Sequence, residues 1–177
     1  MRFLFVLLLI FSSVAHADNV KEIFGNGIFE TSWGASLDEV RASHPDGEFK
    51  QTSGMNIYNV INDREVLSVE RKKNAISFLF TPDMKLYSII TEFKDSAYGS
   101  LLIKLSSLLG DINKNNDLEM AAKTGGMTTG YTSWASDDGS VKVSVYMAQA
   151  GLFSRAKTFL RVENTVKTSA TKESLGL

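Results

Sequence analysis

A run of oxygen-bearing side chains gives this sequence its most regular pattern of possible metal ligands. Asp111, Asn113, Asn115, Asp117 and Glu119 alternate with other residues, as do the ligands in the first nine positions of a calcium-binding loop. The sixth position of that template holds asparagine instead of glycine. The twelfth holds alanine, which cannot supply a bidentate carboxylate. We therefore favour a polar loop here, with ion binding as the alternative.

Short patterns of nucleophilic or phosphate-binding type are present but lie in unsuitable surroundings. The run 123–125 reads Lys-Thr-Gly, and Ser169 and Lys172 have the Ser-x-x-Lys spacing of β-lactamases. Their order along the chain is reversed relative to those enzymes. The Gly-rich run 125–130 precedes a strand pattern and not a helix, so a phosphate would lack the helix N-terminus that attracts it. We expect none of these patterns to be catalytic.

Imidazole and thiol groups, which serve most hydrolases and zinc sites, are scarce. The chain has two histidines and no cysteine, and His16 lies in an N-terminal segment that we expect to be cleaved. His44 precedes Pro45, a position typical of a helix end. We expect its ring to be solvated and to interact favourably with the helix dipole. A catalytic triad would have to use His44, and a zinc site would have one histidine and no cysteine among its ligands. The sequence predicts no enzymatic activity and no cofactor.

The N-terminus has the pattern of a secretory signal. A basic tip at Arg2 precedes nine apolar residues, from Phe3 to Phe11, and a small-x-small box that ends at Ala17. The apolar run is far shorter than the roughly 20 residues of a membrane-spanning helix. We expect residues 1–17 to be cleaved, which leaves a soluble periplasmic or secreted protein without membrane insertion. An exported chain without cysteine fits a bacterial periplasm.

The charge balance narrows the classes of partner. The chain has 19 Lys and Arg against 20 Asp and Glu, a formal net charge of −1. This balance provides no basic surface for nucleic acid or for an anionic membrane. Residues 18–166 are long enough for a single domain, and the polar residues 167–177 read as a flexible tail.

Two helices and a series of strands must position any functional side chain. A capping box of Ser36 and Glu39 begins the first helix, which Pro45 ends. Ser96 is expected to cap the second helix, which ends near Gly110. Its apolar stripe should face the sheet, and it comprises Tyr98, Leu101, Leu102, Leu105, Leu108 and Leu109.

The strand pattern predicts an antiparallel sheet. Strands are expected over residues 27–33, 57–61, 66–71, 75–80, 86–93, 131–135, 141–147 and 158–166. Their short connections cannot hold crossover helices, and Asp138-Gly139 favours a type I′ hairpin. We therefore predict an α+β fold with two helices packed on one face of the sheet. The helix-then-strands order occurs twice, which suggests a tandem α-then-β pseudo-repeat.

The run from Trp33 to Val40, Trp-Gly-Ala-Ser-Leu-Asp-Glu-Val, carries a resemblance. It resembles the start of a helix in small periplasmic α/β domains, namely the small lipoprotein of the outer-membrane barrel assembly machinery and the tandem-repeat β-lactamase-inhibitor proteins. The chain lacks the lipidated cysteine of the first and the disulfide pairs of the second. The resemblance implies a scaffold that binds other proteins, and it assigns no functional residue.

Aromatic side chains near strand ends are the candidate binding residues. Trp33, Tyr131, Trp134 and Tyr146 are of the types enriched at protein interfaces, with core packing as the alternative for each tryptophan. We expect a non-enzymatic domain that binds another envelope or extracellular protein, as an assembly factor or as an inhibitor or immunity protein. The alternative is a protein that binds a small molecule or ion through the loop 111–130.

Overall fold

The computed structural model describes residues 18–52, 54–71, 74–110, 127–149 and 155–166. The predicted leader (1–17) and tail (167–177) lie outside the described residues. So do the possible metal ligands Asp111, Asn113, Asn115 and Asp117, and most of the loop 111–130.

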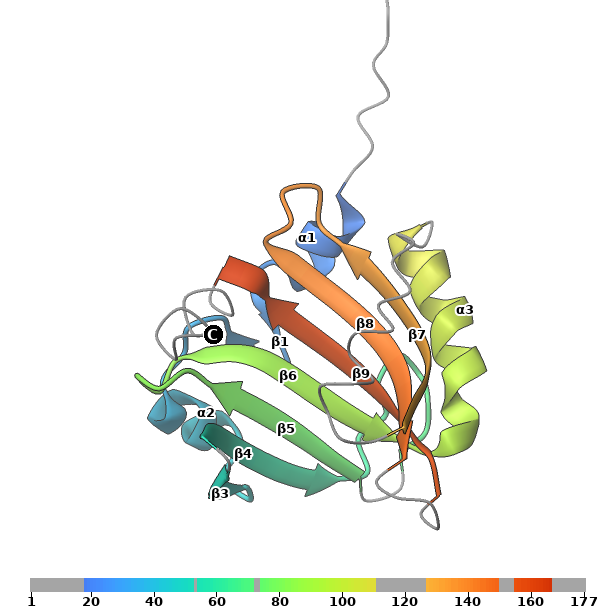
Figure 1. Cartoon of the computed structure of the whole chain (residues 1–177). Helices are drawn as coiled ribbons and strands as arrows, with labels where there is room; N and C mark the ends of the chain where they lie inside the picture. Colours follow the sequence, from blue (N-terminus) through green and yellow to red (C-terminus); the bar gives the residue numbers. More distant parts are fainter. Residues whose placement is uncertain (1–17, 53, 72–73, 111–126, 150–154, 167–177) are drawn as a thin grey trace, which may run out of the picture.

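The described chain contains three α-helices, one short 3₁₀ helix and nine strands (Figure 1). The helices are α1 (Asn19–Phe24), α2 (Leu37–Ser43), η1 (Asp95–Ala97) and α3 (Tyr98–Leu109). The strands are β1 (Gly27–Ile28), β2 (Thr31–Ser32), β3 (Glu48–Thr52), β4 (Met55–Asn62), β5 (Asn74–Phe80), β6 (Leu86–Phe93), β7 (Met127–Ala135), β8 (Val141–Gln149) and β9 (Lys157–Asn164). Among the described residues, no helix is long and apolar enough to cross a bilayer.

Seven strands form one antiparallel sheet, and β1 and β2 form a small hairpin beside it. The order in the sheet is β3-β4-β5-β6-β9-β8-β7. Strands β3 to β6 follow one another as a meander, and β9 then pairs with β6, which joins the first half to β8 and β7. The expected α+β class with an antiparallel sheet is confirmed.

The helices pack on one face of this sheet. Leu37 and Val40 of α2 share a buried cluster with Phe78 and Ile89, while α3 packs on Val162 and its neighbours. Phe78, Ile89 and Val162 are direct cross-strand partners. Because directly opposed residues project from the same face, α2 and α3 lie on the same side. Figure 1 shows α2 along the β3–β6 half and α3 along the β7–β9 half.

Helix α3 buries a face that differs slightly from the predicted stripe. Leu101, Leu105 and Leu109 are buried, whereas Leu108 is 41% exposed. At 3.6 residues per turn, Leu108 lies about 60° from Leu105, on the side away from Leu109. The expectation that Leu108 faces the sheet was wrong. The predicted Ser96 cap is also absent, because η1 leads directly into the helix at Tyr98.

Local signals at the N-terminal end were only partly correct. The capping box of α2 is confirmed: Ser36 Oγ accepts from the Glu39 amide, and Glu39 accepts from the Ser36 amide. The predicted strand 27–33 is a hairpin, because Phe29 and Glu30 take positive φ values of 54° and 63° at its turn.

Two further differences concern other segments. The predicted strand 66–71 is a tight turn closed between Val66 and Val69. Neither α1 nor β3 was predicted.

The turn after β7 ties the first helix to the sheet. Within it only Gly139 has a positive φ, 66°, so the expected type I′ turn, which needs two positive φ values, does not form. The Asp138 carboxylate accepts from Lys21 Nζ at 2.6 Å, and from the Ser140 amide at 2.9 Å. The Lys21 hydrogen bond first, and then those of Ser140 and Ser136, hold the pKa of Asp138 well below its usual range.

This lowered pKa predicts a defined pH dependence of stability. An Asp whose folded-state pKa is lowered stabilises the fold above its unfolded pKa of about 3.9, and this contribution is lost as the pH falls further. Asp138→Asn is therefore expected to lower the urea midpoint at pH 7, and the gap to the natural protein should shrink below about pH 4. Asp137→Asn is the control for removal of one negative charge. A gap that stays constant down to pH 2 would contradict the assignment.

Candidate functional site

The sheet has a second face that none of the described helices covers, which we call the distal face. Along β8, Val143 and Val145 point to the helices, so Tyr146 points away from them. The same alternation places Phe159 on this face, because Leu160 of β9 is in the core. Tyr131 of β7 is directly opposite Tyr146 and shares its face.

Three aromatic rings form a row across the strands of the distal face. Tyr131 pairs with Tyr146, and Tyr146 pairs with Phe159, so the rings occupy β7, β8 and β9 in turn. The ring centroids of Tyr131 and Tyr146 are 6.4 Å apart, and those of Tyr146 and Phe159 are 5.3 Å apart, both stacked. All three side chains are half-buried. We call these three residues the aromatic row.

Charged side chains border the aromatic row in pairs. Arg161 and Glu163 form an ion pair with side chains only 20% and 16% exposed, and Arg161 Nε donates to Ser88 Oγ at 3.1 Å. At the other side, Lys157 pairs with Glu92, the cross-strand partner of Phe159. Within each pair the opposite charges neutralise one another. A protein partner can therefore cover this surface without supplying a counter-charge.

The environment of the row favours the neutral form of the Tyr146 hydroxyl. Burial raises the pKa of Tyr146, although the nearby Arg161 opposes this. Its phenol therefore stays protonated at neutral pH and can donate a hydrogen bond. Lys142 Nζ lies 5.6 Å from the centre of the Tyr131 ring, a cation–π contact that orients the outermost ring of the row.

The first half of the sheet continues the distal face with aliphatic and polar side chains. Tyr58 and Val60 of β4 are in the core, so Ile57 and Ile61 face the other way, and Ile61 is 66% exposed. Ile90 of β6 lies opposite Arg161, at the boundary between the two halves. The distal face thus combines an aromatic half, a mixed half in which Asn59 and Ser77 share a 2.7 Å hydrogen bond beside the isoleucines, and an internally paired charged region between them.

The structure separates the four predicted binding residues. Tyr131 and Tyr146 are neighbours on the distal face. Trp134 is 1% exposed on the opposite face, where its Nε1 donates to the Gly110 carbonyl at 3.2 Å. A ring enclosed in the core has no surface for a partner, so Trp134 does not belong to the candidate surface. Trp33 is half-buried against both core clusters and donates to the Phe24 carbonyl at 2.8 Å.

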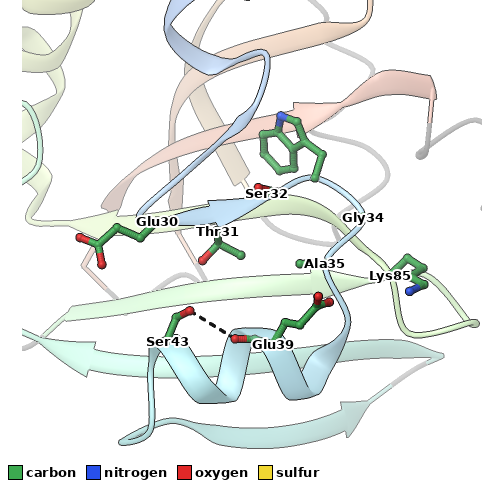
Figure 2. Close-up of a pocket in the computed structure, with 9 residues that line it drawn as sticks. Glu30, Thr31, Ser32, Gly34, Ala35, Glu39, Ser43 and Lys85 are labelled. Carbon is green, nitrogen blue, oxygen red and sulfur yellow. Dashed lines mark hydrogen bonds between the residues drawn. The ribbon is translucent and has the colours of Figure 1, made fainter.

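A polar pocket of about 460 Å³ opens on the helix-bearing side (Figure 2). One wall is the segment 31–35 and another is α2, with Lys85 at one end. The segment is pinned to β6, because the Gly34 amide donates to the Leu86 carbonyl at 2.8 Å and the Leu86 amide donates to the Ala35 carbonyl at 2.9 Å. Its shape is therefore set by backbone hydrogen bonds.

His44 has structural contacts in place of the predicted solvated position. Its Nε2 lies 3.1 Å from the Phe29 carbonyl and 3.3 Å from Thr31 Oγ1, and its ring is 4.9 Å from the Phe78 ring. The imidazole thus connects the β1–β2 turn to the core. Among the residues that the structure describes, no group of three or more His, Cys, Asp or Glu side chains could hold a metal ion.

Phe159 and the Arg161–Glu163 pair were not predicted as part of the site. Alternation along β9 could have placed all three on one face of that strand. Their position beside Tyr146 depends on the register between β8 and β9, which the sequence did not indicate.

Comparison of the chain with protein-family models, curated proteins and solved structures finds no match.

Proposed function

We propose that the chain is an exported, non-enzymatic domain that binds another envelope or extracellular protein through the distal face of its sheet. The observation that supports this most is the aromatic row, which lies on a face that no described helix covers. Tyrosine and arginine are enriched at interface hot spots, and large aromatic side chains lose little conformational entropy when they are buried by a partner. A half-buried Arg–Glu pair beside the row adds directional polar groups.

The arrangement of the two halves also supports a binding scaffold. Helix α2 precedes β3–β6, and α3 precedes β7–β9, and each helix has its own core cluster. This order matches the proposed α-then-β pseudo-repeat. Two halves joined edge to edge at β6 and β9 produce a wide continuous sheet face, which is larger than either half could offer alone.

Export is the second part of the proposal, and the contacts of Asp18 are compatible with it. Asp18 caps α1 by accepting from the Lys21 amide, and it also accepts from the Asp137 amide at 2.9 Å. A cut after Ala17 leaves both side-chain contacts in place. We expect the mature protein to begin at Asp18 and to be released from cells by osmotic shock.

Site-specific crosslinking in intact cells tests the proposed surface. A photoreactive phenylalanine analogue at position 131 is expected to give one discrete adduct with an envelope or extracellular protein. The same analogue at position 103 is the control, because Ile103 is 74% exposed on α3, on the other side of the sheet. Adducts at both positions alike, or at position 103 alone, would refute the distal face as the binding surface. N-terminal sequencing of the adduct checks the expected start at Asp18.

A further inference from the structure

The polar pocket beside α2 is separate from the distal face and carries charges of both signs. Glu39 of α2 and Lys85 lie at the same end of it, with Ala35 close to both (Figure 2). Glu30, at the other end, points outward, and its carboxylate is 3.8 Å from Arg64 Nη2. The charged groups left to a ligand inside the pocket are therefore one carboxylate and one ammonium.

Both groups have unused binding capacity. Glu39 Oε2 accepts from the Ser36 amide and from Ser36 Oγ, each at 2.7 Å, which leaves its second oxygen uncommitted. Hydrogen bonds from Ser36, the backbone amide first, lower the pKa of Glu39, so the carboxylate is charged at neutral pH. Within the described part of the chain, the Lys85 ammonium makes no hydrogen bond or ion pair, while its backbone is bridged to Ser36.

The combination selects against ligands with a single charge. An anion near Lys85 would also be close to the Glu39 carboxylate, and a cation near Glu39 would be close to the Lys85 ammonium. A small molecule that carries both charges can satisfy both groups and adds no net charge to the pocket. The pocket volume of about 460 Å³ suits a small ligand.

We propose that this pocket binds a small zwitterion of amino-acid or dipeptide size, with its carboxylate on Lys85 and its ammonium on Glu39. The hydroxyl groups of Ser32 and Ser43 also line the pocket and can bind further polar atoms of the ligand. The capping box and the pinned segment 31–35 hold the two charged residues before a ligand arrives, which lowers the entropy cost of binding.

Titration with three related compounds tests this proposal. Glycylglycine carries both charges, N-acetyl-glycylglycine only the carboxylate, and glycylglycinamide only the ammonium. Nuclear magnetic resonance of the mature protein is expected to show saturable shifts of the Gly34 and Ala35 amide signals with glycylglycine. Each singly charged analogue should bind at least about tenfold more weakly, since one charge-assisted hydrogen bond is lost.

Two variants and a control locate the effect. Lys85→Gln and Glu39→Gln should each raise the dissociation constant of glycylglycine at least about tenfold, and glutamine can still form the capping box. Lys50→Gln removes an exposed ammonium on β3 and should leave binding unchanged. Equal binding of all three compounds, no saturable shift, or equal binding by the Lys85→Gln variant would overturn the proposal. Crosslinking at position 131 should not change in these variants, so the two proposals can fail separately.

Discussion

Leu105→Ala is expected to lower the free energy of unfolding by about 3 kcal/mol, within the range of 2–5 kcal/mol for buried leucine truncations. Leu105 is fully buried at the centre of α3, in the same cluster as Trp134 and Val143. Removing its side chain leaves a cavity between the helix and the sheet, since neighbours close such space only in part. Urea denaturation followed by tryptophan fluorescence measures the loss.

The matched control lies one turn further along the same helix. Leu108 is 41% exposed whereas Leu105 is fully buried, so Leu108→Ala removes the same atoms from a much less enclosed position. Its cost should stay below about 1 kcal/mol, because the neighbouring solvent can fill the space that the side chain leaves. Equal costs at the two positions would mean that α3 packs on the sheet in a different rotation from the one described.

Tyr131→Ala is expected to weaken capture of the protein partner by about 30-fold or more, which corresponds to the hot-spot threshold of about 2 kcal/mol. The Tyr131 ring is the outermost of the aromatic row, stacked on Tyr146 and contacted by Lys142. A partner that covers the row would bury the Tyr131 ring against the partner's own surface. Affinity for the crosslinked partner can be measured by surface plasmon resonance.

Two comparisons separate loss of binding from loss of structure. Tyr131→Phe keeps the stacked ring and should retain most of the affinity. Ile103→Ala, on the helix-bearing side, should retain all of it, because Ile103 is 74% exposed and distant from the row. The thermal midpoint of Tyr131→Ala should shift by only a few degrees, since the residue is at the sheet edge. Unchanged affinity in Tyr131→Ala would exclude the aromatic row as the binding surface.

Local patterns predicted much of the framework on which these sites depend. The capping box of Ser36 and Glu39 was correct because its partners are three residues apart and need no tertiary contact. Alternation along β8 was also sufficient to separate Val143 and Val145 from Tyr146, since successive side chains of a strand point to opposite faces. The burial of Leu101 and Leu105 followed from helical periodicity in the same way.

Turn geometry was harder to predict, because the favourable contacts are remote in sequence. Nothing in the residue types of Phe29 and Glu30 favours positive φ values, and glycine or asparagine is the usual choice. In the structure, His44 and Thr31 both contact the Phe29 carbonyl, which helps to hold the turn. A hairpin thus replaced the predicted strand.

Only the tertiary structure decided which residues meet at the two candidate sites. The sequence alone determined the α+β class, the antiparallel strands and the faces along single strands, because these follow from periodicity within one element. Pairing of β9 with both β6 and β8 brought Phe159 to Tyr146 and placed Arg161 beside Ser88. The same packing enclosed Trp134 and brought Lys85 near Glu39. Such contacts join residues from 13 to 73 positions apart. Their energies depend on how whole elements pack, which no local pattern specifies.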